Sequence, residues 1–513
     1  MAGKSKENLN SLLDERAAAR PDKGFLFSEA DGREWSYSQF AEAVARTAGL
    51  LRSHRIKQGD VVSLLLPNSA EYVIAYFACW RLGAIAGPVN SLLKSEEVEW
   101  VIGNSESKLL LTTEEFAKAH AEADLPETIL FEDVDAATAR IDPILGGAEV
   151  STDDEAIIIY TSGTTGKPKG CLLTHGNLIA NARQIAEWMG FGPEDRLLTV
   201  MPLFHMNAVS VTTMSALYAG GSTVVSPKFS ATRFWEVVER FQVTSFGSVA
   251  TMLSMLLSVS WEKRAVSGAT SLVTRHSSLR FAMCGSAPVP VEVLRRFEED
   301  FGVLVIEGYG LSESTCRSTF NPPNENRRPG SCGLPIGNEM LVVDENDDPV
   351  NDGELGEIVL RGENIFKGYF RNPKATAEAF RGGWFHTDDI GYRDADGFYY
   401  IADRKSDMII RGGENIYPRE IDDVLYRHPA VAHAAVIGVP DELYGEEVAA
   451  FVVLKEGASA TDEDLIDYCR EHLADFKCPK TLYFVDDIPK GPTGKLLKRE
   501  LARLARELDG DVN

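Results

Sequence analysis

The feature that most constrains the fold is a short loop rich in glycine and hydroxyl residues, Tyr160 to Gly170. It follows Ile157 to Ile159, a run of branched apolar residues that predicts a buried strand. After the loop, apolar residues recur at helical spacing from Leu178 to Met189. A strand, a glycine-rich loop and a helix in this order predict an α/β fold.

The composition of the loop favours anion binding. Gly163 and Gly166 allow the backbone to turn so that successive N–H groups face one anion. Side-chain donors and charges are added by Thr161, Ser162, Thr164, Thr165, Lys167 and Lys169. The loop suits a triphosphate but is not a Walker loop, because Pro168 follows Lys167 and the glycines are too close together. Taken alone, the pattern also fits a solvated turn.

The chain length of 513 residues exceeds what one hydrophobic core organises, so we expect more than one domain. Further strands are predicted at 279–283 and 303–306. After the strand predicted to end at Ile401, a polar stretch begins at Asp403. Apolar runs at 431–439 and 448–454 and a helix at 462–473 then predict a small α+β domain. We therefore predict a large domain, 1–405, and a small domain, 406–513.

Charge and composition exclude several classes of protein. The net charge of −25 disfavours a general nucleic-acid binder, which would be basic. The longest apolar stretch, Tyr72 to Val89, is interrupted by Arg81 and by glycines, so it predicts a buried helix and a strand instead of a membrane span. The first 21 residues lack an apolar signal core and are expected to form an exposed lead-in to a helix. The C-terminal Asp-Gly-Asp-Val-Asn carries no address signal.

The seven cysteines are scattered and form no Cys-x-x-Cys pair, so neither a disulfide framework nor a zinc site is predicted. A reducing cytoplasm is the expected location.

Further sequence blocks accompany the loop in a fixed order. They are Phe204-His205, Gly285-Ser286-Ala287-Pro288, Gly308 to Glu313, Gly353-Glu354-Leu355, Trp384 to Asp389, Asp403-Arg404 and Pro492 to Lys495. Together they resemble the signature blocks of the adenylate-forming superfamily of CoA ligases, adenylation domains and luciferases, and they cover most of the chain. The closest types are acyl-CoA ligases, including crotonobetaine/carnitine–CoA and medium-chain fatty acid–CoA ligases.

This resemblance implies a large N-terminal domain of α/β subdomains with a β-barrel-like part, and a small mobile α+β C-terminal domain. It also implies that the protein joins a carboxylic acid to coenzyme A through an acyl-adenylate, using ATP and Mg²⁺ and releasing pyrophosphate and AMP. The implied partners are the acid, ATP and coenzyme A, without nucleic acid or an integral membrane segment, in a monomer or homodimer.

The resemblance also assigns roles at the nucleotide. Glu313 would hold Mg²⁺, and Ser312, where the family usually has Thr, would bind the α-phosphate. Tyr309 would stack on adenine, and Asp389 would accept the ribose hydroxyls. The remaining implied ATP-site residues are Gly285, Ser286, Ala287, Glu307, Gly308, Gly310, Ile401 and Arg404. One departure is Asp388, where the family usually has Gly in Thr-Gly-Asp.

For catalysis, the resemblance makes Lys495 the residue that bridges the substrate carboxylate and the α-phosphate. His205 would gate the acyl pocket and orient the acid without acid–base chemistry, and Ser406 would be the hinge. Gly412, Gly413 and Glu414 would line the coenzyme A channel. Lys477 and Lys480 would meet coenzyme A phosphates, or would be ordinary surface lysines.

The acyl pocket is expected to draw on Phe246, Val249, Met252, Met283, Cys284 and Ser314, which are mainly small or apolar. They favour a hydrophobic medium-chain or aromatic monocarboxylate. Relatives that activate malonate carry Arg before Tyr-Gly, where this chain has Gly308, so a small diacid is disfavoured. Arg317 is the one charge expected near the pocket, unless it lies outside.

Three other functions remain open. Loading of an amino acid onto a carrier protein is disfavoured. Adenylation domains of that type usually have an Asp after a Phe to pair with the α-amine, and this chain has Phe229-Ser230 at the corresponding place. A luciferase-like oxygenase is too similar to be excluded by motif. A nonenzymatic binding descendant is disfavoured because Glu313 and Lys495 are both present.

Overall fold

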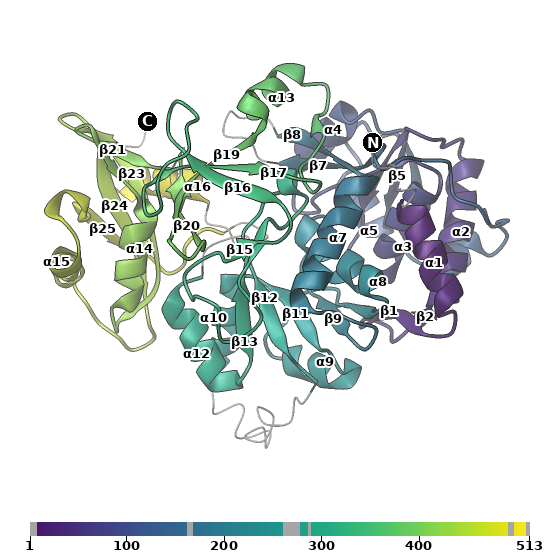
Figure 1. Cartoon of the computed structure of the whole chain (residues 1–513), viewed down its shortest axis with the longest axis horizontal. Helices are drawn as coiled ribbons and strands as arrows, with labels where there is room; N and C mark the ends of the chain where they lie inside the picture. The colour runs from purple at the N-terminus through teal and green to yellow at the C-terminus, as the bar shows by residue number, and fades with distance from the viewer. Residues whose placement is uncertain are drawn as a thin grey trace.

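Figure 1 shows the computed structural model of the chain, which describes residues 8–161, 168–259, 278–285, 289–405, 407–490 and 497–508. Its largest hydrophobic core extends from Leu9 to Tyr399. Two further cores contain only residues from Ile409 onward. The molecule therefore consists of a large N-terminal domain and a smaller C-terminal domain, the latter green to yellow in Figure 1.

One seven-stranded sheet of the large domain has the order β13-β12-β11-β9-β10-β1-β2. Its strands are β1 (Gly24–Ser28), β2 (Glu34–Ser36), β9 (Arg196–Thr199), β10 (Ser222–Val225), β11 (Ser245–Ser248), β12 (Phe281–Cys284) and β13 (Leu304–Glu307). All neighbours are parallel except β1 and β2. Ser248 pairs with Cys284 and Cys284 with Glu307, so β11, β12 and β13 end side by side. Ligands bind at such carboxyl ends in α/β sheets.

The other seven-stranded sheet has the order β18-β8-β7-β4-β3-β5-β6. Its strands are β3 (Val61–Leu65), β4 (Ile85–Pro88), β5 (Leu109–Thr112), β6 (Glu127–Leu130), β7 (Glu155–Thr161), β8 (Lys169–Thr174) and β18 (Gly368–Tyr369). The predicted passage from the glycine-rich loop straight into a helix is wrong, because β8 comes first and pairs antiparallel with β7. The short apolar run from Cys171 to Leu173 continues the sheet, and periodicity alone did not separate it from the loop.

The helices of the large domain are α1 (Leu9–Ala19), α2 (Tyr37–Ser53), α3 (Ala70–Arg81), α4 (Ser95–Asn104), α5 (Glu114–Ala119), α6 (Val134–Thr138), α7 (His175–Met189), α8 (Ser215–Ala219), α9 (Phe234–Phe241), α10 (Ala250–Ser258), α12 (Val291–Phe301) and α13 (Pro373–Ala379). Shorter turns are the π-helix η1 (Asn207–Met214) and the 3₁₀ turns η3 (Ser312–Ser314) and η4 (Arg381–Gly383).

The fully buried helix α3 contacts strands of both large sheets, which confirms the predicted helix and strand within 72–89. The N-terminal segment differs from the prediction of an exposed lead-in. From Leu9 it is itself a helix, α1, and it buries Leu9, Leu12 and Leu13 in the main core because their spacing places them on one helical face.

The rest of the large domain consists of a four-stranded antiparallel sheet, β16-β17-β19-β20, and a two-stranded ribbon. The strands are β14 (Thr319–Phe320), β15 (Leu334–Pro335), β16 (Glu339–Val343), β17 (Gly356–Arg361), β19 (Phe385–Arg393) and β20 (Tyr399–Arg404). They correspond to the part predicted to be barrel-like, and the described strands form an open sheet. Tyr399 begins β20, which the sequence predicted to end at Ile401.

The C-terminal domain contains the sheet β22-β21-β24-β23, with β25 parallel to β24. Its elements are β21 (Ile409–Arg411), β22 (Glu414–Ile416), α14 (Pro418–Arg427), β23 (Val431–Asp441), β24 (Gly445–Leu454), α15 (Asp462–His472), η5 (Asp475–Lys477), β25 (Thr481–Phe484) and α16 (Lys498–Leu508). The predicted strands and helix of this domain are confirmed. Helix α14 packs on β23 and contacts β20 of the large domain.

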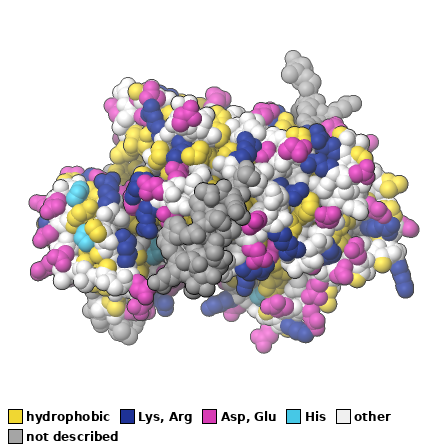
Figure 2. Space-filling view, turned by 90° about the horizontal axis from the view of Figure 1, so that it is seen from below, with side chains coloured by type: hydrophobic (Ala, Val, Ile, Leu, Met, Phe, Trp, Pro, Cys, Tyr) yellow, Lys and Arg dark blue, Asp and Glu magenta, His cyan; other side chains and the backbone are white. Residues whose placement is uncertain are grey.

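All seven cysteines are free thiols, and six of them are buried. Within the described ranges, no helix is long and apolar enough to cross a membrane. Figure 2 shows Lys and Arg side chains interspersed with Asp and Glu on one face of the molecule.

Candidate active site

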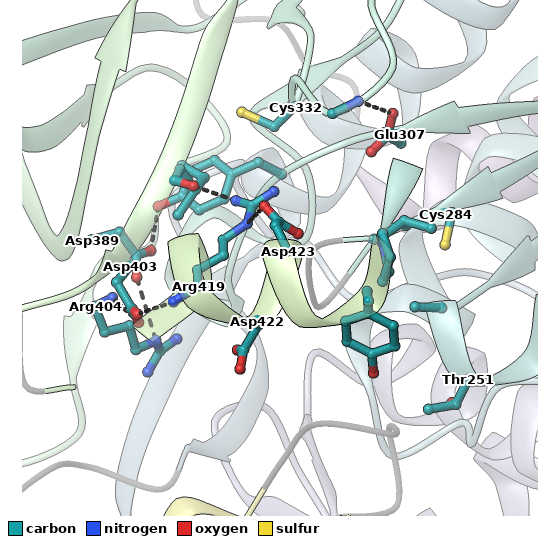
Figure 3. Close-up of a pocket in the computed structure, with 18 of the residues that line it drawn as sticks. Thr251, Cys284, Glu307, Cys332, Asp389, Asp403, Arg404, Arg419, Asp422 and Asp423 are labelled. Atoms are coloured by element: carbon teal, nitrogen blue, oxygen red, sulfur yellow. Dashed lines mark hydrogen bonds and ion pairs between the residues drawn. The ribbon is translucent and has the colours of Figure 1, made fainter. Parts of the chain in front are cut away.

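A cavity of about 280 Å³ lies where the two domains meet. Its large-domain wall contains Cys284, Gly285 and the segment Glu307 to Leu311, at the carboxyl ends of β12 and β13. Its small-domain wall is formed mainly by α14, which Figure 3 shows lying across the strand ends. Residues far apart in the chain thus share one site.

The predicted adenine and ribose residues are brought together in this cavity. Tyr309 donates a hydrogen bond from its hydroxyl to Asp389 Oδ2 at 2.6 Å. Arg404 Nε lies 3.3 Å from Asp389 Oδ1, since the two residues are paired across β19 and β20. Burial, and then the Asp389 carboxylate, raise the pKa of Tyr309 well above its ordinary value, so the phenol stays protonated and donates. Ile401 also lines the cavity.

The unusual Asp388 occupies a bulge in β19 and has φ 58°. Residues other than glycine rarely adopt this left-handed backbone, although Asp tolerates it better than most. The side chain is exposed, and the carbonyl accepts the Lys405 N–H at 2.8 Å. The conformation explains why glycine suits this position and shows that the chain keeps the turn without it.

The described ends of the glycine-rich loop approach the predicted magnesium residue. Thr161 Oγ1 donates to Glu313 Oε1 at 3.4 Å, and the Tyr369 hydroxyl donates to the same oxygen at 3.1 Å. Lys169 Nζ lies 5.1 Å from the centre of the Tyr369 ring. Ser312 and Glu313 form part of η3, which ends at Thr315 with φ 66°, a strained value for a β-branched residue.

These residues fit a magnesium ion held jointly with phosphate. Mg²⁺ prefers oxygen ligands and is usually bound through one or two carboxylates together with substrate phosphates and water. Glu313 and the Thr161 hydroxyl supply such oxygens. The described part of the chain contains no cluster of three or more His, Cys, Asp or Glu side chains able to hold a metal.

The small-domain wall contains functional candidates that the sequence analysis missed. Arg419 donates to the Ile401 carbonyl, and its backbone N–H donates to Asp403 Oδ2 at 3.2 Å. Asp422 and Asp423 line the cavity beside it (Figure 3). Burial raises the pKa of Asp422 well above its ordinary value, partly opposed by Lys498. The only sequence signal was the apolar stripe of α14, which leaves these polar residues on its other face.

Glu307 is the buried carboxylate of the large-domain wall. It accepts the Gly330 N–H at 3.0 Å, and burial raises its pKa to about 8. The carboxyl group is therefore mostly protonated at neutral pH and adds little negative charge to a site meant for a nucleotide.

The ring of the predicted gate residue, His205, lies next to that of Phe204. The ring centroids are 4.5 Å apart, and the rings are tilted by 51°. Its Nε2 is buried and has no hydrogen-bond partner among the described residues. Burial lowers its pKa to about 4, so the ring is neutral at physiological pH. A neutral ring agrees with orientation of a substrate more than with proton transfer.

Of the predicted acyl-pocket residues, Cys284 lines the cavity, whereas Phe246, Val249, Met252, Met283 and Ser314 are buried outside its lining. Phe246 packs edge-on against Phe234 of α9 at 4.8 Å. Arg317 is inside the domain, with 1% of its surface exposed, and its guanidinium lies against Gly285. The positive charge of Arg317 therefore lies inside the large domain, next to a residue that lines the cavity, although Arg317 itself does not line it.

The predicted coenzyme A residues lie away from the cavity. Gly412 and Gly413 form the two-residue turn between β21 and β22, with φ 59° and 93°. Two positive φ values are typical of a type I′ hairpin and require glycine-like residues. Lys477 pairs with Glu420 at 2.6 Å and Lys480 with Asp441 at 3.3 Å.

Several predicted residues lie outside the described residues: Ser162, Gly163, Thr164, Thr165, Gly166 and Lys167 of the loop, Ser286 and Ala287, the hinge residue Ser406, and Lys495. Lys490 and Lys498, the nearest described lysines on either side of Lys495, both line the cavity.

Comparison with known proteins identifies the family. The model of the AMP-binding enzyme family matches residues 13–370, and that of its C-terminal domain matches residues 420–495. The chain is 38% identical to a sulfoacetate–CoA ligase of Cupriavidus necator, over 96% of this chain and 97% of that protein. It is 36% identical to an oxalate–CoA ligase of Arabidopsis thaliana, over 97% and 98%. The crystal structure of ATP-bound MatB from Rhodopseudomonas palustris superposes with a TM-score of 0.89 at 30% identity, over 98% of this chain and all of that one. The chain therefore belongs to the AMP-binding enzyme family and is an AMP-forming acyl-CoA synthetase, which uses ATP to join a carboxylic acid to coenzyme A.

Proposed function

We propose that the cavity between the domains carries out two successive half-reactions. In the first, the acid carboxylate attacks the α-phosphorus of ATP, and pyrophosphate leaves. In the second, the thiol of coenzyme A attacks the acyl carbon, AMP leaves, and the thiol proton passes to solvent. Binding and charge neutralisation are the main tasks of the protein in such phosphoryl chemistry.

The observation that carries this proposal is that two groups of residues are joined by one short segment, Tyr309 to Glu313, which lines the cavity as far as Leu311. Tyr309, Asp389 and Arg404 form a linked set suited to a nucleoside. Thr161, Lys169 and Glu313 converge at the ends of the loop, where Mg²⁺ and the phosphates would bind. Ser312 is adjacent and would bind the α-phosphate.

Lys495 is proposed as the catalytic cation. The nearest described lysines on either side of it in sequence, Lys490 and Lys498, line the cavity. Lys498 Nζ lies 3.4 Å from Asp407 and 3.6 Å from Asp403, close to the proposed domain boundary. A pivot at Ser406 would then withdraw Lys495 and bring Gly412 to Glu414 to the site for the second half-reaction.

The test is acid-dependent exchange of pyrophosphate into ATP, followed by thioester formation with coenzyme A. Lys495→Ala should lower the exchange roughly 1000-fold, since one charge-stabilising group is lost. It should still form thioester from supplied acyl-adenylate.

Gly413→Trp should do the reverse and slow only the thioester step. An added Cβ at Gly413 meets no atom within 4 Å, so a side chain has room there. Gly413→Ala is the matched control, because it carries the same backbone strain without the bulk. Loss of the same half-reaction in both the Lys495 and the Trp variant would overturn the two-conformation scheme.

The identity of the acid is less constrained than the reaction. The predicted hydrophobic acid stays a prediction, because Phe246, Met252 and Met283 are buried outside the cavity lining. The two relatives named above act on sulfoacetate and oxalate, each of which has a second acid group. Cytoplasmic location and a monomeric or dimeric state stay predictions.

A further inference from the structure

Arg317 is a buried cation that forms no ion pair with any residue that the structure describes. Only 1% of its surface is exposed. Among the described residues, its Nε and Nη2 have no hydrogen-bond acceptor, and Nη1 has only a long contact of 3.5 Å to the Cys316 carbonyl. A guanidinium keeps its charge in proteins, and an unpaired buried charge is strongly unfavourable. The Phe320 ring, 5.4 Å away, compensates only in part.

The backbone holds Arg317 in place. Its N–H donates to Asn181 Oδ1 at 3.3 Å. Its carbonyl accepts from Asn181 Nδ2 at 2.7 Å and from Asn364 Nδ2 at 3.2 Å. Both asparagines are fully buried. These hydrogen bonds fix the backbone at Arg317, whose side chain is buried inside the domain.

The guanidinium lies directly behind the cavity wall. A Cβ built on Gly285 would stand 2.5 Å from Arg317 Nη2 and 2.7 Å from the Gly308 carbonyl oxygen. Gly285 and Gly308 both line the cavity. Because neither has a side chain, the cation packs against backbone at the carboxyl ends of β12 and β13.

Asn207 lies on the same face of this sheet. A Cβ on Gly247 would stand 2.8 Å from Asn207 Oδ1. Gly247 pairs with Met283 in register, and Met283 and Gly285 are two residues apart. Cβ atoms built on Gly247 and Gly285 therefore point to the same face of the sheet. Asn207 begins the buried π-helix η1, a rare element often found at functional sites.

The unpartnered buried polar atoms of the described residues include His205 Nε2, Asn207 Nδ2 and Oδ1, and Arg317 Nε and Nη2. Buried polar groups in proteins are nearly always paired, so such a group points to a partner that binds from outside. An oxyanion matches a guanidinium, which binds it through two parallel N–H groups, and an amide can add a further donor.

We propose that the acid activated by this enzyme carries a second oxyanion group, a carboxylate or a sulfonate, remote from the reacting carboxylate, and that Arg317 binds it with help from Asn207. The inference rests on the proposed function and narrows its substrate class. The sequence disfavoured a small diacid because Gly308 stands where malonate-activating relatives have Arg. The inference replaces that prediction, since the Arg317 side chain places a cation close to the backbone of Gly285 and Gly308.

The test compares acids of matched length: glutarate, 4-sulfobutyrate and pentanoate, with shorter and longer homologues of each. We expect the wild-type enzyme to form thioester at least about 100-fold more efficiently, by kcat/KM, from one of the dianionic series than from the monocarboxylates. The carboxylate and sulfonate series distinguish the two sources of the oxyanion.

Arg317→Met should lower kcat/KM for the preferred dianionic acid about 100-fold and leave that for pentanoate within threefold. It should also abolish the rise in melting temperature that the dianionic acid causes in the presence of ATP. Arg317→Lys should restore part of both. Arg280→Met is the matched control. Arg280 immediately precedes β12, at the end of the strand opposite to Gly285, and pairs with Asp195 at 2.8 Å. Its replacement should not affect selectivity.

Thioester formation from monocarboxylates with no preference for either dianionic series would overturn the inference and leave the ligase assignment intact. Equal loss for all acids in Arg317→Met, with no selective effect, would make Arg317 a core residue that Phe320 alone stabilises. If Arg317→Met does not fold, the wild-type selectivity and Arg317→Lys still decide. Absence of acid-dependent exchange with every acid would instead contradict the proposed function.

Discussion

The proposed nucleotide side, Tyr309, Asp389 and Arg404, and the proposed acid side, Asn207 and Arg317, differ in how their polar groups are satisfied. The residues of the nucleotide side bond to one another without a ligand. Those of the acid side hold buried polar atoms without partners among the described residues. The nucleotide side lines the cavity, whereas Arg317 lies behind its wall, against Gly285.

We attribute this difference to what each side is proposed to recognise. A preorganised nucleotide side would bind ATP with little rearrangement. The acid side keeps groups whose burial is unfavourable until a substrate pairs with them. A ligand lacking the matching group would leave them unpaired, which is an efficient basis for selectivity. Three sets of substitutions test this comparison.

The largest effect is expected from Asp389→Ala. The change removes the common partner of Tyr309 and Arg404 and the proposed ribose acceptor, so the KM for ATP in pyrophosphate exchange should rise about 100-fold. The KM for the acid should change little. Tyr309→Phe, which removes only the hydroxyl, is the control and should have a smaller effect. An unchanged KM for ATP in Asp389→Ala would contradict the ribose assignment.

The second effect concerns stability without ligand. Replacing an unpaired buried charge by an apolar side chain should stabilise the fold, so Arg317→Met should raise the free energy of unfolding by roughly 1–3 kcal/mol. Arg404→Met leaves the buried Asp389 with one partner fewer and should lower it by about 1–2 kcal/mol. Denaturant titration of the ligand-free variants measures both. Equal destabilisation by the two changes would mean that Arg317 has a partner of its own.

The smallest effect is expected at Asp388, on the nucleotide side. Asp388→Gly relieves the left-handed backbone at φ 58° and should raise the free energy of unfolding by about 0.5–1 kcal/mol. Asp388→Asn separates charge from strain, since it keeps a side chain that tolerates this backbone. Thermal unfolding compares the two. If Asn stabilises as much as Gly, charge and not backbone strain is the cause.

Much of the fold could be predicted from local patterns. The strands at β7, β12 and β13, the helices α3 and α7, and the elements of the small domain follow from periodicity and turn residues. Strand β8 was missed because Cys171 to Leu173 is too short to be recognised without its partner β7. The prediction of an exposed lead-in was wrong because Leu9, Leu12 and Leu13 pack in a core formed by distant segments of the chain.

The site was predicted only in part, for a similar reason. Tyr309, Asp389 and Glu313 occupy recognisable motifs. Arg419, Asp422 and Asp423 do not, because a polar helix face has the same pattern whether it meets solvent or another domain.

The α/β class, the glycine-rich loop, the order of the motifs and the chemical groups available for catalysis can all be read from the amino-acid sequence. Which of those groups have partners is visible only in the folded molecule. Tyr309 reaches Asp389 across 80 positions, and Thr161 reaches Glu313 across 152. Arg317 lies against Gly285 and has no counter-ion within the described part of the chain. Pairing depends on distance in space, which local sequence patterns do not encode, and it is pairing that separates a core arginine from one that awaits a substrate.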